Sequence, residues 1–173
     1  MKTELNRIVL SGVDSRFALV VSRWNDAFTS KLANGAREAL TEAFVPDDAI
    51  ETFHVPGAFE LPLACLKAAE TGDYDAVIAL GVVIRGDTPH FDYVAGQAAA
   101  GILQASMQSG VPVMFGVITA DNEEQVVARC GEKADNKGYE AALSAVEMVN
   151  LFRKMDAAKE QGRGEGKVFP HVV

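Results

Sequence analysis

The sequence predicts an α/β domain in which four parallel strands form an open, doubly wound sheet with helices on both faces. Short apolar runs alternate with segments whose apolar residues recur at helical spacing, and this alternation is typical of parallel strands joined by crossover helices. Residues 75–84 show no polar alternation, as expected for a strand that is buried on both faces. The chain has 173 residues, which suits one domain with its own core.

The first half of the chain supplies two strand–helix pairs. Residues 17–22 (FALVVS) form a short apolar run that predicts a strand, and residues 25–44 carry apolar side chains every three or four positions, which predicts a helix. Residues 49–55 (AIETFHV) predict a second strand. The following segment is expected to be helical over residues 62–72, because Pro62 favours a helix start and Gly72 a helix end.

The second half adds two strands and three helices. Thr88 is a suitable N-cap and Pro89 a suitable first helical residue, so a helix is expected from residue 89 to Ser109, before Gly110. The same rules predict strands at residues 75–84 and 111–119, a short helix at 122–130 and a long helix at 136–155.

Residues 156–173 differ in composition, because glycines alternate with charged residues. We therefore expect a single domain over residues 1–155 and a flexible C-terminal tail over residues 156–173.

Composition and charge exclude several classes of function. The formal net charge is -8, from 24 acidic and 16 basic residues, and no basic stripe is visible, so nucleic acids and anionic membranes are not expected partners. No apolar run reaches membrane-spanning length and no signal peptide is recognised, which predicts a cytoplasmic protein. Cys65 and Cys130 match no metal-ligand spacing and are expected to be reduced and buried; a redox or metal pair is the alternative.

Functional side chains are expected at one edge of the sheet, because ligands of open α/β sheets bind beyond the carboxyl ends of the strands. The segments that follow the strands are residues 23–25, 55–60, 85–90 and 119–121. His90 would lie in the first turn of a helix, beside free N–H groups that favour anion binding. A helix start explains Thr88 and Pro89 but not an imidazole, which can donate and accept protons near neutral pH.

Two further side chains in these segments have both a functional and a structural interpretation. Trp24 directly follows the first strand, where an indole could stack on a flat heterocycle or simply pack in the core. Glu60 could accept hydrogen bonds from a polyol or an amine, or it could cap the next helix.

Taken together, the motifs resemble the lumazine synthase family. The segments RWND, VPGAFELP, DAVIALGVVIRGDTPHFDYV, GVPVMFGVIT and NKGYEAALSAVEMVNL occur in the family's order and spacing, from about Phe17 to Phe152. The resemblance implies a flavodoxin-like, three-layer fold and a transferase of riboflavin biosynthesis. In that reaction 5-amino-6-(D-ribitylamino)uracil condenses with 3,4-dihydroxy-2-butanone 4-phosphate to 6,7-dimethyl-8-ribityllumazine, phosphate and water, and neither a metal nor an organic cofactor is needed.

The resemblance also implies roles for residues at matching positions. His90 matches the proton-transfer residue. The positions that bind the ribitylaminouracil are Trp24, Ala58, Phe59, Glu60, Val82, Val83, Ile84 and Phe115. The positions that bind phosphate are Asp87 (through its backbone N–H), Thr88, Arg129 and Lys137. Lys137 has an alternative role as the counter-charge of Asp135, which replaces the first glycine of the family's GNKG motif and is expected to form a similar turn.

In the family, the residues at the positions of Phe115 and Arg129 come from the neighbouring subunit and complete each site. The resemblance therefore implies a homo-oligomer. We expect at least a homopentamer and favour an icosahedral capsid of pentamers, because no residues are inserted between Arg129 and the last helix. Residues 7–12 (RIVLSG) are expected to add a strand to a neighbouring subunit. Riboflavin synthase is a further candidate partner.

Three other functions remain open at this stage. The chain could be a non-catalytic flavin- or lumazine-binding module, a shell-forming protein whose function is assembly, or an unrelated phosphosugar enzyme on the same fold.

Overall fold

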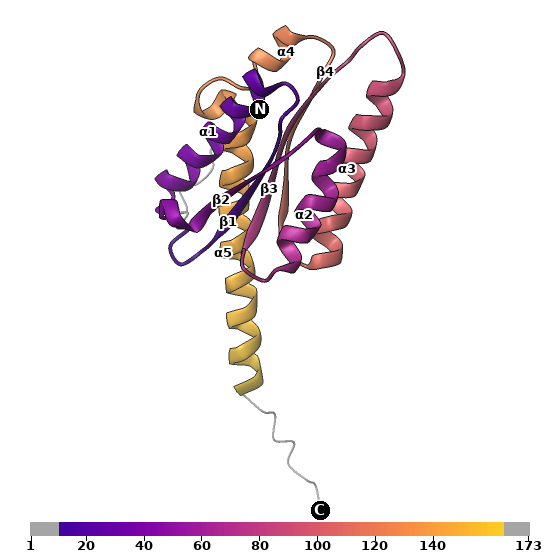
Figure 1. Cartoon of the computed structure of the whole chain (residues 1–173). Coiled ribbons are helices and arrows are strands. Elements are labelled where there is room, and N and C mark those ends of the chain that lie inside the picture. The colour runs from indigo at the N-terminus through magenta and orange to yellow at the C-terminus, as the bar shows by residue number, and fades with distance from the viewer. Residues whose placement is uncertain (1–10, 165–173) are drawn as a thin grey trace, which may run out of the picture.

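The computed structural model describes residues 11–164 and has the predicted α/β architecture (Figure 1). One sheet holds four strands in the order β2-β1-β3-β4, and all pairings are parallel. The strands are β1 (Phe17–Ser22), β2 (Ile50–Val55), β3 (Ala76–Ile84) and β4 (Val113–Ala120). The α-helices are α1 (Asp26–Glu42), α2 (Leu61–Glu70), α3 (His90–Ser109), α4 (Glu123–Val127) and α5 (Lys137–Gly164). Short 3-10 turns are η1 (Asp47–Ala49), η2 (Ala58–Glu60) and η3 (Lys133–Asp135).

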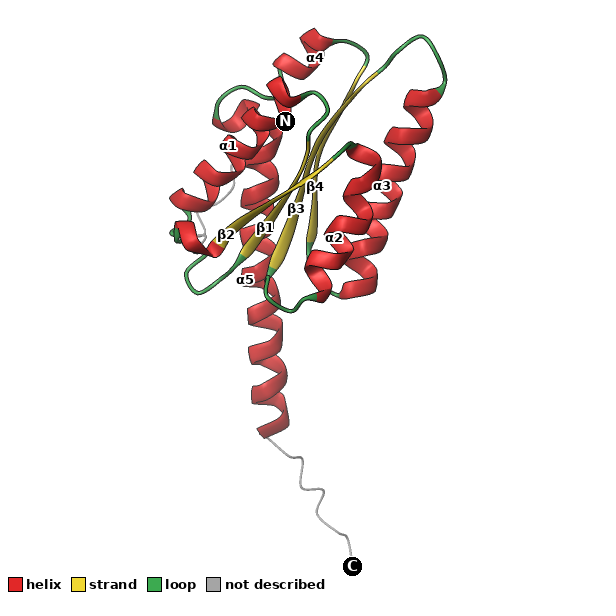
Figure 2. Ribbon diagram, in the orientation of Figure 1, coloured by secondary structure: helices red, strands yellow, loops and turns green. Residues whose placement is uncertain are grey.

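The helices form the outer layers of a three-layer sandwich with flavodoxin-like topology (Figure 2). Helix α1 packs beside α5 on one face of the sheet, and α2 packs beside α3 on the other face. The expected fold class is thus confirmed, including the strand order that a doubly wound sheet requires.

Strand β1 shows why the central strands β1 and β3 lack polar alternation. All six of its residues are buried. Phe17, Leu19 and Val21 belong to the core under α1 and α5, whereas Ala18 and Val20 belong to the core under α2 and α3. Side chains alternate between the two faces of a strand, so both sets must be apolar when both faces are covered. Full burial of a leucine or valine contributes about 1.5–3 kcal/mol.

The start of α3 differs from the prediction by one residue. The helix begins at His90, and Pro89 rather than Thr88 occupies the N-cap position. The Thr88 hydroxyl still accepts the backbone N–H of His90, at a long distance of 3.4 Å. His90 therefore does lie in the first helical turn, as the sequence predicted.

The C-terminal helix is longer than predicted. Helix α5 runs to Gly164 instead of ending near residue 155, and its last turns project beyond the sheet (Figure 1). Residues 156–164, which the sequence assigned to a flexible tail, are helical. This segment contains good helix formers and an ion pair of 3.3 Å between Lys159 and Asp156.

Some expectations concern residues that lie outside the described part of the chain. Of the N-terminal segment 7–12, only residues 11 and 12 are described, so its addition to a neighbouring sheet stays a prediction. Residues 165–173 are likewise outside, and the division into a domain and a tail stays a prediction.

Two general properties follow for residues 11–164. Within this range no helix has the length and apolar character that crossing a membrane requires. No cluster of three or more His, Cys, Asp or Glu side chains in the same range could hold a metal ion.

Both cysteines are free and buried, which confirms that they pack as small apolar side chains. Cys65 is fully buried in the core under α2 and α3, and Cys130 is 3% exposed on the opposite side of the sheet.

The environment of Cys65 predicts a thiol that does not react in the folded protein. Burial raises the pKa of Cys65 to about 12, so at pH 8 almost none of it is the reactive thiolate. We expect iodoacetamide to alkylate Cys65 at least about a hundredfold more slowly in the native protein than in guanidinium-unfolded protein. Peptide mass spectrometry over a time course measures both rates, and equal rates would contradict the burial.

Candidate active site

The first candidate pocket lies where the order of the strands in the sheet reverses. Strands β1 and β3 are neighbours, β2 flanks β1 on one side, and β4 flanks β3 on the other, so the crevice between their carboxyl ends is a topological switch point. A pocket of about 230 Å³ opens there, and we call it the switch-point pocket. It is lined by Trp24, Asn25, Ala58, Val82, Val83, Ile84, Gly86, Thr88, His90, Phe91 and Val94.

Trp24 is at the surface of this pocket. Trp24 is 64% exposed, which rules out the alternative that it packs in the core. Part of the indole lies against Gly57, where an added Cβ would come within 2.5 Å of the Trp24 Cε3 atom. Glycine at position 57 therefore allows the ring to lie close to the backbone that follows β2, with indole surface left free for a ligand.

Asn25 joins the ends of β1 and β3. Its backbone adopts the left-handed conformation, with φ 63°, and its Nδ2 donates to the Val82 carbonyl at 3.0 Å. The sequence placed Asn25 in a segment that follows a strand but assigned it no role. The left-handed conformation is one that asparagine tolerates better than most residues, and here it directs the side chain across to β3.

Glu60 acts as a cap in this structure. Its Oε2 accepts the backbone N–H of Gly57 at 2.9 Å, which is the structural role that the sequence allowed. Phe59, Glu60 and Asp87 do not line the switch-point pocket. All three side chains are exposed, and their proposed contacts to the ribityl chain and phosphate stay predictions.

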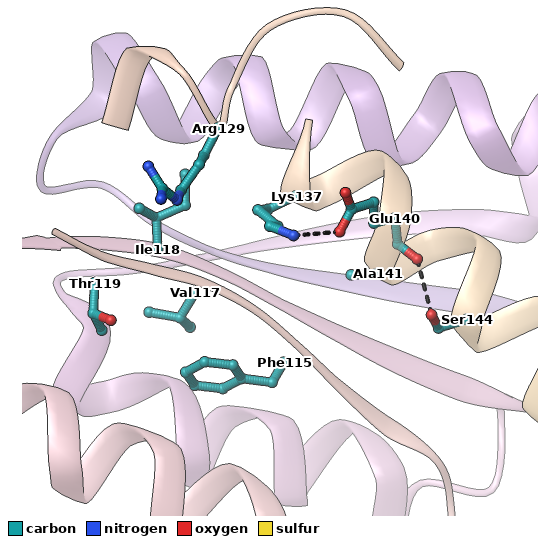
Figure 3. Close-up of a pocket in the computed structure, with 9 residues that line it drawn as sticks. All are labelled: Phe115, Val117, Ile118, Thr119, Arg129, Lys137, Glu140, Ala141 and Ser144. Atoms are coloured by element: carbon teal, nitrogen blue, oxygen red, sulfur yellow. Dashed lines mark hydrogen bonds and ion pairs between the residues drawn. The ribbon is translucent and has the colours of Figure 1, made fainter. Parts of the chain in front are cut away.

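A second pocket contains the predicted residues Phe115, Arg129 and Lys137 and lies along the outer edge of β4 (Figure 3). This edge pocket has a volume of about 380 Å³. Its lining comprises Phe115, Val117, Ile118, Thr119, Arg129, Lys137, Glu140, Ala141 and Ser144. Phe115 points to one side of the strand, and Arg129 and Lys137 approach from the other side (Figure 3).

The polar groups of the edge pocket have identifiable partners. Lys137 Nζ lies 2.5 Å from Glu140 Oε2, so its counter-charge is Glu140 and not Asp135. Arg129 donates to the Gln125 carbonyl at 2.7 Å. The expected glycine-like turn at Asp135 is wrong, because Asp135 ends η3 and the left-handed residue is Lys133, with φ 44°.

Asn136 fixes the segment that runs from Arg129 to Lys137 at the start of α5. It is 2% exposed, and its Nδ2 donates to the carbonyls of Lys31 and Gly131 at 3.0 and 2.9 Å. Its Oδ1 accepts the backbone N–H groups of Gly138 and Tyr139. One buried amide thus connects α1, the loop after α4 and the first turn of α5.

The structure separates the predicted site residues into two sets. The switch-point pocket and the edge pocket share no lining residue: His90, Thr88 and Trp24 line the first, and Phe115 and Arg129 line the second. The switch-point pocket is also smaller than the roughly 300–1,000 Å³ that is usual for ligand sites. Sequence motifs identified residues of both pockets but could not show that one chain keeps them apart.

Comparison with known proteins identifies the family. The chain matches the family described as 6,7-dimethyl-8-ribityllumazine synthase over residues 14–153. Proteins of that name from Chlorobium luteolum and Chlorobium phaeovibrioides are 55% and 52% identical over 146 and 142 residues. These alignments cover 84% and 82% of this chain and 94% and 92% of the relatives. A third, from Chlorobium chlorochromatii, is 51% identical over 146 residues, which are 84% of this chain and 94% of the relative.

The packing around Asn136 predicts that Gly138→Ala destabilises the fold. An added Cβ would come within 2.0 Å of the Leu32 carbonyl oxygen, so α1 and α5 would have to separate. We expect a loss of about 1–3 kcal/mol in the free energy of unfolding. Gly131→Ala is the matched control, because its Cβ would make only an ordinary contact of 3.4 Å with Asp135. Chemical denaturation measures both, and equal effects would refute the clash.

Proposed function

The chain belongs to the 6,7-dimethyl-8-ribityllumazine synthase family, and we propose that it uses the switch-point pocket of one subunit and the edge pocket of the next for the family's reaction. It is a transferase that condenses 5-amino-6-(D-ribitylamino)uracil with 3,4-dihydroxy-2-butanone 4-phosphate. The observation that carries the proposal is the convergence of Trp24, Thr88 and His90 at the carboxyl ends of β1 and β3.

The switch-point pocket would bind the uracil and the ketone side by side. The exposed indole of Trp24 offers a stacking surface for the pyrimidine. Val82, Val83 and Ile84, at the carboxyl end of β3, supply backbone groups for the pyrimidine edge. The N-terminus of α3, next to Thr88, favours a phosphate through the positive end of its helix dipole.

The reaction requires several proton transfers, which we assign to His90. The amine of the uracil attacks the ketone and the resulting carbinolamine loses water to form an imine. Phosphate then leaves from the ketone-derived chain, and ring closure with loss of a second water gives the lumazine. An imidazole can accept a proton from the nucleophilic amine and return one to a leaving oxygen. Holding two substrates in the right orientation lowers the barrier independently of proton transfer.

The edge pocket of a neighbouring subunit would complete this site. In Arg129, one guanidinium nitrogen donates to Gln125, and a guanidinium has five N–H donors in a fork that suits phosphate. Phe115 is 47% exposed and would cover the heterocycle opposite Trp24. Because each subunit presents both pockets, a closed ring of subunits can complete every site.

The assembly that we propose is a homopentamer, which can build further into an icosahedral capsid. Its support is the separation of the two pockets and the short connection between Arg129 and α5, which contains only the 3-10 turn η3. Riboflavin synthase as a partner and a cytoplasmic location belong to the same proposal and rest on family membership.

Turnover is the direct test of this function. We expect the purified protein, mixed with both substrates, to form a fluorescent lumazine and to release phosphate. His90→Ala is expected to slow the reaction about 10²–10⁴-fold and to retain activity that comes from substrate proximity. Circular dichroism would check that the variant folds. If the wild-type chain forms no lumazine but binds riboflavin, it is a binding module; an unchanged rate in His90→Ala would refute the role of His90.

Mixing two impaired variants tests the shared site. His90→Ala lacks the proton-transfer group of the switch-point pocket, and Arg129→Ala lacks the phosphate-binding group of the edge pocket. After the two are unfolded and refolded together in equal amounts, about a quarter of the sites should combine two intact halves. We therefore expect the mixture to recover about a quarter of wild-type activity, although each variant refolded alone does not. A mixture no more active than its components would show that each site lies within one chain. Light scattering gives the size of the assembly.

A further inference from the structure

Arg85 makes an unusual set of contacts at the base of the turn between β3 and α3. Its guanidinium forms a two-pronged pair with Asp92, with Nη2–Oδ1 and Nη1–Oδ2 distances of 3.0 and 3.4 Å. Asp92 belongs to the first turn of α3, two residues after His90. The guanidinium carbon also lies 4.1 Å from the ring centroid of Phe91, which lines the switch-point pocket.

The same side chain reaches the turn between β4 and α4. Arg85 Nε donates to Asp121 Oδ1 at 3.0 Å, and the Arg85 backbone N–H donates to the Ala120 carbonyl at 2.9 Å. Asp92 and Asp121 both raise the pKa of Arg85 above its ordinary value, through hydrogen bonds first and charge second. One side chain thus connects the turns that follow two adjacent strands.

Polar contacts continue from Asp121 to the edge pocket. The Asp121 backbone N–H donates to Gln125 Oε1 at 3.0 Å, and the Gln125 carbonyl accepts from Arg129 at 2.7 Å. Arg85 is therefore linked to His90 through Asp92 and the first turn of α3, and to Arg129 through Asp121 and α4. Neither pocket is lined by Arg85 itself.

We propose that Arg85 is a positioning residue that fixes the turn carrying Thr88 and His90 and the segment after α4 that carries Arg129. This inference rests on the proposed function, because it assumes that these residues act on the two substrates. Exposed ion pairs contribute little to stability, and the Arg85 side chain is 42% exposed, so its main effect falls on geometry. Misplacement of a reacting group by about 1 Å can lower a rate about 10²-fold.

The test compares Arg85→Ala and Arg85→Lys with a matched control, Arg37→Ala. Arg37 has a similar exposure of 37% and pairs with Asp47 at 2.5 Å, outside both pockets. We expect kcat to fall about 10–100-fold in Arg85→Ala. Lysine should not restore it, because an ammonium cannot bridge Asp92 and Asp121 with planar, two-pronged contacts. Arg37→Ala should stay within about twofold of the wild type.

Single substitutions of Asp92 and Asp121, the two partners of Arg85, separate its effect on the His90 turn from its effect on Arg129. Asp92→Asn should mainly lower kcat, with a smaller rise in the KM for the phosphorylated ketone, because the turn that it loosens carries His90 and also Thr88. Asp121→Asn should mainly raise that KM, because it loosens the connection toward Arg129. A loss of stability alone would lower the amount of active enzyme in both variants and would not divide kcat from KM in this way.

Amide hydrogen exchange gives a readout that does not depend on turnover. Exchange over residues 86–91 should be faster in Arg85→Ala and Asp92→Asn than in Arg37→Ala. Kinetic constants of both Arg85 variants within twofold of the control, or unchanged exchange in this turn, would overturn the positioning role while the proposed function stands. A wild-type chain that makes no lumazine would refute the proposed function, and the positioning role would fall with it.

Discussion

The site depends on the side-by-side placement of β1 and β3, two strands that are buried on both faces. Their apolar side chains need helices on both sides of the sheet, and the crossovers to those helices leave the sheet in opposite directions. The crevice between the two strand ends is a consequence of this packing. Asn25 then joins the two ends at the pocket through its hydrogen bond to Val82.

The outer edge of β4 imposes a second constraint. An edge strand leaves a row of backbone N–H and C=O groups without strand partners, and proteins usually cover or disrupt such edges. Here Phe115 and the cations Arg129 and Lys137 border that edge on opposite sides. A neighbouring subunit that docks against this edge would bury exposed aromatic surface and place the cations beside its own switch-point pocket.

Much of the fold could be predicted because each element has a local signature. The buried strands and the helical spacing of α1 and α3 depend on residues close in sequence, and these were located within a few residues. The end of α5 was missed because glycines suggested a tail, although the intervening residues favour continued helix, to which each further residue adds one hydrogen bond. The ion pair between Lys137 and Glu140 could have been predicted from the sequence, since residues three apart are neighbours on a helix.

The contacts that organise the site were beyond local reasoning. Asn25 and Val82 are 57 residues apart, and Arg85 and Asp121 are 36 apart, so only the folded sheet shows that they meet. These contacts also bear on the alternative of a protein whose only function is to form a shell. Such a protein needs complementary outer surfaces, but it needs no left-handed asparagine below a pocket and no guanidinium bound to both adjoining turns. The features that cost conformational freedom lie where two substrates would meet, and this placement favours an enzyme over a protein that only forms a shell.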